Sequence, residues 1–399
     1  MIKLDKDTVF LIMSLTPWDY QIGNNAKDIA FELSKEYKTV YINIPTKRLE
    51  YYNGKSKALK NRRLIIAGKQ DYLQRINNNL LIFTPPVIIE SINWIKIRFL
   101  FNVLNYFNNY RFYKSIKKVL NELNIVKYIV INDNDVFNGY YAKKFINPQL
   151  YIYYLRDNLS AISYWQFHVS NLEPKLISRS DIVLCNSAYL QEYSLKYNAK
   201  SYFIGQGCNV DLFSNIKVAS KIFANLKMDG PKIGYAGACL SIRLDIQLIE
   251  RLAIEKPEWN FVFVGPQDQD FKLSRLHQLN NVTFTGAVDI SELPEYINKF
   301  DVCINPQLLN DLTIGNYPRK IDEYLCLGKP TVATRTKAME MFEDHVYLAE
   351  NTQEYINKIY KALAENNEEN RQKRIAYAKS HSWKNNVKNI LSKIKSEEV

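Results

Sequence analysis

Short apolar runs alternate with stretches of helical periodicity along the whole chain, and this alternation limits the possible folds more than any other feature. The runs are 9–14, 39–43, 80–84, 127–131, 150–155, 182–185 and 202–204 in the first half, and 232–236, 261–264, 282–284, 302–305 and 331–333 in the second. Strands that alternate with helices form parallel sheets with helices on their faces. The sequence therefore predicts an α/β protein with two Rossmann-like, doubly wound domains.

The division between the two domains is expected near residue 210. A polar stretch over 214–231 separates the two series of runs, and 399 residues are enough for two domains with separate cores. We predict a first domain over 1–210 and a second over 211–379. Trp383 is an isolated large side chain in the polar tail, and such a residue usually docks into a groove.

Composition narrows the class of protein. Hydrophobic residues make up 47% and charged residues 24%, which is usual for globular domains and excludes a disordered or collagen-like chain. The five cysteines are widely spaced and form no zinc or redox motif, which favours a reducing cytoplasm. No run reaches 18 apolar residues, so we expect no membrane-spanning helix.

The net charge of +12 predicts an anionic partner. Residues 91–120 contain six basic and eight aromatic residues and no acid, and residues 51–70 contain six basic residues and no acid. Such segments suit contact with an anionic membrane, although a solvated core helix has a similar composition. We expect a cytoplasmic chain that associates peripherally with the inner face of the cell membrane. No nucleic-acid partner is expected, because no recognised motif accompanies the charge.

Two residues in the second domain could bind a phosphate. The run 232–236 ends at Gly237, and a glycine at the end of a strand lets the backbone approach a phosphate. Arg243 follows six residues later and could pair with a diphosphate. A structural turn and a surface arginine are the alternatives.

The segment 316–332 has the pattern of a loop, a helix, a glycine stop and a strand. Pro318 can occupy the first helical position, so Lys320 would lie near the helix amino terminus, where a diphosphate could bind. Glu323 lies one turn later and could accept hydrogen bonds from both ribose hydroxyls. The spacing of this cation and carboxylate matches that of a nucleotide.

Several motifs together resemble those of a known family. They occur in order at 23, 181–183 with 186–187, 209–211, 234–237, 281–282 with 285–286, 301–302 and 318–330. With them the chain resembles GT-B fold, nucleotide-sugar-dependent glycosyltransferases of bacterial capsule and exopolysaccharide biosynthesis. The resemblance implies that the two domains face a central cleft, that the first binds the acceptor, and that a C-terminal helix over 380–399 crosses back to the first.

The resemblance also implies roles for individual residues. The nucleotide-sugar-binding residues would be Gly237, Arg243, Gly286, Val288, Lys320, Glu323 and Tyr324. Lys320 would hold the diphosphate and Glu323 the ribose, and Gly286 to Val288 would flank the base. Gly315 stands where many retaining members have a further glutamate, so retention and inversion both stay open.

Asp157 is the candidate catalytic residue. It follows the run 150–155, where a carboxylate in the cleft could deprotonate an acceptor hydroxyl, as an aspartate does in a similar inverting glucuronosyltransferase. A helix cap or a partner for Arg156 is the alternative. The expected acceptor or cleft residues are Gly23, Asn24 and His168.

The predicted function is transfer of a sugar from a nucleotide sugar, UDP-sugar being favoured, to a lipid-linked or saccharide acceptor in cell-surface polysaccharide synthesis. We expect no cofactor and no metal, because cations and helix amides would neutralise the leaving diphosphate. No Asp-x-Asp motif is expected at a strand end where a divalent cation would be needed, and the segment 132–135, Asn-Asp-Asn-Asp, is the nearest imitation of one. The alternatives are a non-enzymatic nucleotide-sugar-binding component of a polysaccharide assembly complex and a nucleotide-sugar 2-epimerase.

Overall fold

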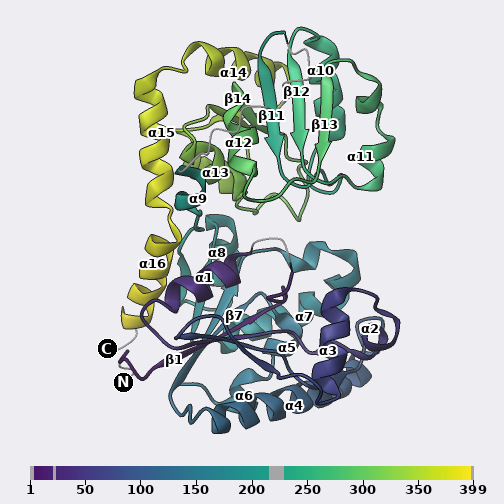
Figure 1. Ribbon diagram of the computed structural model, residues 1–399, viewed down its shortest axis with the longest axis vertical. Helices are drawn as coiled ribbons and strands as arrows, with labels where there is room; N and C mark the ends of the chain where they lie inside the picture. Colours follow the sequence, from purple (N-terminus) through teal and green to yellow (C-terminus); the bar gives the residue numbers. More distant parts are fainter. Residues whose placement is uncertain (1–3, 21–23, 215–228, 397–399) are drawn as a thin grey trace. The chain divides into compact units, whose positions relative to one another are not determined.

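The structure, a computed structural model, describes residues 4–20, 24–214 and 229–396, which form two compact units (Figure 1). Domain 1 comprises residues 1–205 and 386–399, and domain 2 comprises residues 206–385. The division at 205 comes five residues before the one expected from the sequence. The reason is that Cys208 donates a backbone hydrogen bond of 2.7 Å to His381 and pairs with Ser382, which fixes this segment to domain 2.

Domain 1 contains an eight-stranded sheet. In spatial order its strands are β10 (Ser201–Phe203), β9 (Ile182–Cys185), β8 (Leu150–Leu155), β7 (Tyr128–Asp133), β1 (Val9–Ser14), β2 (Thr39–Ile42), β5 (Leu80–Phe83) and β4 (Leu73–Arg75). Neighbouring strands are parallel except for β4, which pairs antiparallel with β5. β1 and β8 are buried along their whole length, as expected for the centre of a parallel sheet covered on both faces.

Helices flank this sheet (Figure 1). They are α1 (Asn25–Leu33), α2 (Arg48–Asn53), α3 (Lys57–Ile66), α4 (Arg98–Glu122), α5 (Val136–Gly139), α6 (Ala142–Ile146), α7 (Ser163–Arg179) and α8 (Ala188–Leu195), with a small pair of strands, β3 (Thr46–Lys47) and β6 (Ile88–Ile89). Polar side chains start several of them: Ser187 accepts from the backbone of Leu190 at the beginning of α8.

Domain 2 contains a six-stranded parallel sheet. Its strands in spatial order are β13 (Val282–Gly286), β12 (Asn260–Val264), β11 (Lys232–Ala236), β14 (Val302–Asn305), β15 (Thr331–Thr334) and β16 (Tyr347–Ala349). Counted from β11, this is the order 3-2-1-4-5-6, in which the strand order reverses between the first and fourth strands. Ligands of such sheets bind outside the carboxyl ends of those two strands, here β11 and β14.

The remaining helices belong mainly to domain 2. They are α9 (Val210–Ser214), α10 (Ile246–Glu255), α11 (Gln269–Leu273), α12 (Leu293–Asn298), α13 (Lys320–Cys326), α14 (Thr352–Ala364), α15 (Glu368–Ser380) and α16 (Trp383–Ser396), the last of which continues into domain 1. Trp383 is buried, and a Cβ on Gly207 would lie 2.2 Å from its ring. This tryptophan therefore anchors the start of α16 in domain 2.

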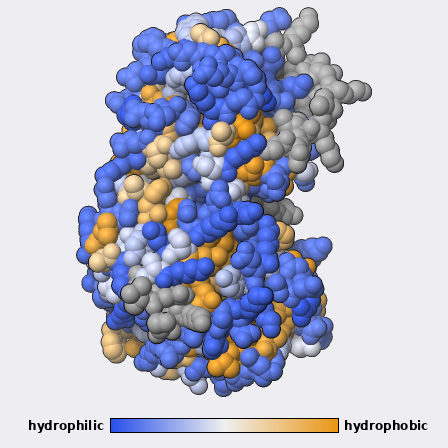
Figure 2. Space-filling model, turned by 90° about the vertical axis from the view of Figure 1, so that its left-hand side faces the viewer, coloured by the Kyte–Doolittle hydropathy of each residue, from blue (hydrophilic) through white to orange (hydrophobic). Residues whose placement is uncertain are grey.

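The fold class predicted from the sequence is confirmed, since both large sheets are parallel, apart from the edge strand β4, and are flanked by helices. The boundaries of β8, β9, β11 and β14 are those expected, whereas β3, β4, β6 and β16 were not predicted. Figure 2 shows one face of the surface, on which hydrophobic residues form patches among hydrophilic ones. Among the described residues, none of the helices is both long and apolar enough to cross a membrane.

Candidate functional site

Glycines shape the backbone at the carboxyl end of β11. Gly237 has φ +140° and donates its N–H to the carbonyl of Val264, 2.8 Å away. Gly265 has φ +146°, and a Cβ there would lie 2.1 Å from the carbonyl oxygen of Gly237. Both positions need glycine because of the positive φ and the close approach of the two chains. The result is a turn without side chains at the place where the topology puts a ligand.

The loops that leave β11 and β14 are joined by hydrogen bonds. Leu308 donates its backbone N–H to the carbonyl of Arg243, and the side chain of Asn310 donates to the carbonyl of Ile242, both at 2.9 Å. Within the second loop, Gln307 donates to the carbonyl of Thr313 at 2.7 Å. The turn that carries Arg243 and the loop that leads to α13 therefore form one unit.

Lys320 lies beside the Gly237 turn. A Cβ on Gly237 would be 3.2 Å from Cε of Lys320, and the ammonium group lies 4.8 Å from the ring centroid of Tyr235. Burial, together with the positive charge of Arg243, lowers the pKa of Lys320 to about 8. Two cations are thus close enough to repel each other, and an anion bound between them would relieve this repulsion.

The other predicted residues of α13 have different surroundings. Glu323 is half-buried and pairs with Arg319 at 3.4 Å. Tyr324 is fully buried, and its hydroxyl accepts from the backbone N–H of Ala236 at 2.8 Å. Tyr324 thus fixes the end of β11 immediately before Gly237, so any effect it has on a nucleotide would come through the position of the turn.

Asp322 anchors α13 from the buried side, a contact that the sequence analysis missed. Its carboxylate accepts from the hydroxyl of Tyr317 at 2.7 Å and pairs with Nδ1 of His381 at 2.8 Å. Burial raises the pKa of Asp322, although the bonds to His381 and Tyr317 oppose this shift. The sequence signal was weak, because His381 lies far along the chain in a polar tail.

Gly286, Val288 and Gly315 complete the predicted set. Gly286 ends β13 with φ +75°, accepts a hydrogen bond of 2.9 Å from Gly265, and has open space where a Cβ would stand. Val288 is half-buried against an apolar cluster of domain 2. Gly315 is buried in the loop before α13. Gly286 therefore stands next to the Gly237 and Gly265 backbone, at the same edge of the sheet.

In domain 1 the strand order reverses between β1 and β7, as it does between β11 and β14 in domain 2. A buried polar network lies at the carboxyl end of β7. Asp133 ends β7 with no exposed surface. It accepts from the hydroxyl of Ser14 and from Nε of Arg156, both at 2.6 Å. The sequence analysis considered Asp133 only within 132–135, as an imitation of a metal motif. The structure places Asp133 at the end of β7, where it pairs with Arg156, and Asp135 as the cap of α5.

Asp157 belongs to this network. One of its carboxylate oxygens lies 3.0 Å from the guanidinium of Arg156, and its backbone N–H donates to the side chain of Asn134. The side chain of Asp157 is 21% exposed, whereas that of Asp133 is 1% exposed. Of the two carboxylates, Asp157 is thus the one that an acceptor could reach, and Arg156 holds it in place.

Of the predicted acceptor residues, the structure describes Asn24 and His168. Gly23 lies outside the described residues. Asn24 caps α1 through a 2.9 Å hydrogen bond from the backbone of Lys27. His168 is buried and stacks on Phe101 with 3.6 Å between ring centroids, and burial lowers its pKa. In this structure Asn24 and His168 have local structural roles.

Domain 1 also contains a cavity of about 210 Å³. Leu15 and Ile44, which follow β1 and β2, contribute to its wall, so it opens at the carboxyl edge of the sheet. Leu49, Trp94 and Tyr164 line the other side. The cavity is mainly apolar and is large enough for part of a lipid chain or one sugar ring.

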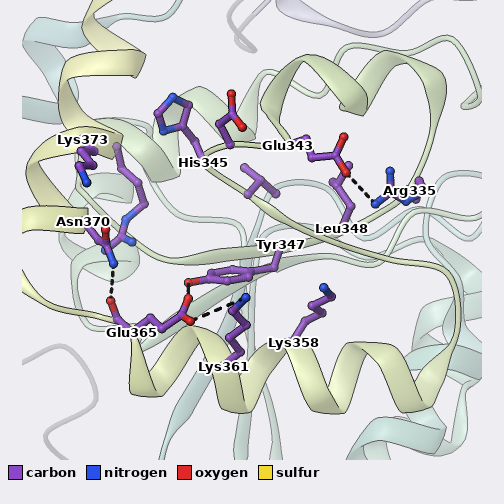
Figure 3. A pocket seen from close by; sticks show the side chains of 13 residues that line it. Arg335, Glu343, His345, Tyr347, Leu348, Lys358, Lys361, Glu365, Asn370 and Lys373 are labelled. Carbon is purple, nitrogen blue, oxygen red and sulfur yellow. Dashed lines mark hydrogen bonds and ion pairs between the residues drawn. The ribbon is translucent and has the colours of Figure 1, made fainter.

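A second cavity, of about 310 Å³, lies in domain 2 between β16, α14 and α15 (Figure 3). Two ion pairs lie in its wall, Arg335 with Glu343 at 3.0 Å and Lys361 with Glu365 at 3.7 Å. Basic side chains outnumber the acidic ones, because Lys358, Lys373 and Arg374 also line it. It lies along the edge strand β16, with Tyr347 and Leu348 in its wall. None of Gly237, Arg243, Lys320 and Glu323 lines this cavity, so it is separate from the predicted donor site.

Comparison with known proteins finds a family match within domain 2. Residues 231–365 match the family model "Glycosyl transferases group 1". The match lies within domain 2, which is therefore similar to the group 1 glycosyltransferases. This segment contains the Gly237 turn, Arg243, Lys320 and Glu323. The resemblance to GT-B glycosyltransferases that the motifs predicted is confirmed.

One curated relative and several solved structures are similar to the chain. The relative is the putative teichuronic acid biosynthesis glycosyltransferase TuaH of Bacillus subtilis (strain 168), 29% identical over 226 residues, which are 54% of this chain and 57% of that protein. HepE of Anabaena in complex with UDP has a TM-score of 0.66 and 17% identity, over 98% of this chain and 99% of that one. An α,α-trehalose-phosphate synthase (UDP-forming) of Burkholderia vietnamiensis has a TM-score of 0.70 and 10% identity, over 98% and 100% of the two chains. At these identities the solved structures show the fold alone, which is GT-B.

Proposed function

We propose that this chain is a glycosyltransferase that moves a sugar from a nucleoside diphosphate sugar to a lipid-linked or saccharide acceptor in cell-surface polysaccharide synthesis. The observation that carries the proposal is the position of Lys320 beside the Gly237 turn, with Arg243 close enough to lower its pKa. Positive charge and open backbone at this point of the sheet are what a diphosphate requires.

UDP is the favoured nucleotide, and two findings on similar proteins support the choice of substrates. HepE, which shares the fold, was crystallised with UDP and with UDP-glucose. TuaH is described as a putative glycosyltransferase of teichuronic acid biosynthesis, and teichuronic acid is a cell-surface polysaccharide. Because the match spans 57% of TuaH, its activity is carried over here as a proposal.

In the proposed reaction, the bond between the anomeric carbon and the diphosphate oxygen breaks while the acceptor oxygen bonds to the sugar. Lys320 and Arg243 stabilise the negative charge that develops on the leaving diphosphate. Glu323 accepts hydrogen bonds from the ribose hydroxyls. Asp157 takes the proton of the acceptor hydroxyl, and Arg156 keeps its carboxylate oriented.

The test is a donor panel. The full chain is incubated with UDP-, GDP-, ADP- and dTDP-sugars, and release of the nucleoside diphosphate is measured with and without EDTA. We expect release from one donor, insensitive to EDTA, lost in Lys320→Ala and retained in Lys272→Ala, which removes an exposed lysine of α11. Absence of release and of a thermal shift with every donor would refute the proposal.

A further inference from the structure

The amino-terminal end of α4 exposes an unusual group of apolar side chains. Trp94, Ile97, Phe99 and Leu100 are 71%, 65%, 78% and 42% exposed, and all lie within seven residues. We call these four residues the α4 patch. Isolated exposed apolar residues are ordinary, but several in one short segment mark a surface that binds something.

The α4 patch is held rigidly by its neighbours. Ile92 and Ile95, in the same segment, are buried in the core of domain 1. Phe101, which directly follows the patch in α4, is buried and stacks on His168. The patch therefore cannot turn inward without disrupting these contacts, and its exposure is a feature of the fold.

Trp94 is well suited to leave water. Its only polar group, the indole N–H, donates to the backbone carbonyl of Ser91 at 2.8 Å. The hydrogen bond is local, so it is kept when the ring enters a less polar medium, and the desolvation cost of an unpaired N–H is avoided. Tryptophan is also the residue that prefers the boundary between lipid and water.

Positive charge surrounds the α4 patch. Lys96 and Arg98 alternate with its members, are exposed, and lie 5.0 and 5.5 Å from the ring centroid of Phe167. The nearest acid in the sequence, Glu90, pairs with Arg48 at 2.6 Å and with Arg111 at 3.5 Å. The acid is thus neutralised by two arginines, and the surroundings of the patch keep a net positive charge.

The patch adjoins the cavity of domain 1. Trp94 belongs to both, and Leu49 of α2, which is 62% exposed, lines the same cavity. The two helices lie against the same short strand, β6. A molecule that contacts the α4 patch therefore reaches the mouth of the cavity.

We propose that the α4 patch inserts into the interface of an anionic phospholipid bilayer, with Lys96 and Arg98 binding lipid phosphates. Alternating aromatic and basic residues on a rigid surface match the chemistry of this boundary. The proposal extends the proposed function, because a lipid-linked acceptor would be met at a bilayer next to the cavity. It also narrows the membrane contact predicted for 91–120 to the first ten residues of that segment, since Phe112 and Tyr113 of α4 are buried in the core.

The segment 51–70 contributes less than its composition indicated. Arg62 is buried and pairs with Asp19 at 3.1 Å. Arg63 donates to the backbone carbonyls of Tyr51 and Gly54. These two cations serve domain 1 itself, which concentrates the proposed membrane contact at the α4 patch.

Vesicle flotation tests this proposal. The full chain is mixed with vesicles of phosphatidylcholine alone or with 30% phosphatidylglycerol, a composition chosen to bring the surface charge to about that of a bacterial membrane. We expect flotation with the anionic vesicles that weakens with salt. The double variant Trp94→Ser/Phe99→Ser should lose at least about tenfold in partition coefficient, and Lys96→Gln or Arg98→Gln about fivefold each.

Val126→Ser is the matched control, since Val126 is 85% exposed and follows the opposite end of α4. It should float like the wild type. Equal flotation of the double variant, or no flotation of a wild-type chain that still binds UDP, would overturn the membrane proposal and leave the proposed function intact. If the wild-type chain is a dimer in the absence of vesicles and the double variant is a monomer, the α4 patch is a contact between two copies. This result would also overturn the membrane proposal. Flotation without UDP binding would refute the proposed function alone.

Discussion

Titration of Lys320 predicts how nucleotide binding changes with pH. Burial and the charge of Arg243 lower its pKa to about 8 in the free protein. At that pKa, about one tenth of the side chains are neutral at pH 7, about half at pH 8 and about nine tenths at pH 9. A diphosphate binds the ammonium form, so binding at higher pH requires prior uptake of a proton.

The size of the effect follows from the protonated fraction. The apparent Kd is the intrinsic Kd divided by that fraction, so it should be about tenfold higher at pH 9 than at pH 7, or about 1.4 kcal/mol weaker. At pH 8, UDP binding should take up about half a proton. Burial raises the pKa of Cys239 to about 12 and also raises the pKa of Tyr235 above its ordinary value. Neither of these neighbours of Lys320 therefore titrates between pH 7 and pH 9.

Isothermal titration calorimetry with UDP at pH 7, 8 and 9, in two buffers of different ionisation enthalpy, measures both quantities. Lys320→Arg is the control, because a guanidinium stays charged throughout this range and should give a flat profile. Lys320→Met should bind weakly and also without pH dependence. A wild-type chain that takes up no proton at pH 8, or an arginine variant that weakens as steeply as the wild type, would refute the reasoning.

Three further predictions concern single residues. Gly237→Ala places a Cβ 3.2 Å from Lys320 at φ +140°, so UDP affinity measured by calorimetry should fall at least about tenfold. Asp157→Asn should abolish transfer to an acceptor in a product assay while leaving the Kd for UDP unchanged. Burial raises the pKa of Glu173 to about 7; the stability present below its ordinary value of 4.5 is therefore lost as pH rises through 7. In urea unfolding, the free energy of unfolding of the wild type should fall by about 3 kcal/mol more than that of Glu173→Gln between pH 4 and pH 9.

The sequence was most informative where the chemistry is local. Gly237 directly follows β11, so the pattern of the strand was enough to place this glycine at the strand's end. Lys320 and Glu323 are three residues apart, so their spacing was enough to place both on one helix. The central parallel strands were also predictable, because apolar runs bounded by polar turns have few other interpretations.

Long-range contacts could not be predicted in this way. The bond between Asp322 and His381 joins residues 59 positions apart, and the bond between Ser14 and Asp133 joins residues 119 apart. Neither pair leaves a pattern in a single sequence. The same reason explains His168: its neighbours in the chain gave no sign of the stacking with Phe101 that buries it.

The two domains carry side chains of opposite charge at equivalent places in their sheets. In both sheets the strand order reverses beside the strand that comes first, and polar residues gather at the carboxyl ends there. Domain 1 places two carboxylates at that point, Asp133 and Asp157, held by Arg156, whereas domain 2 places Lys320 and Arg243 beside a bare glycine turn. Carboxylates suit removal of a proton, and cations suit retention of a leaving diphosphate. Substitutions in the two clusters should therefore separate in kinetics, with turnover affected by the first and nucleotide affinity by the second.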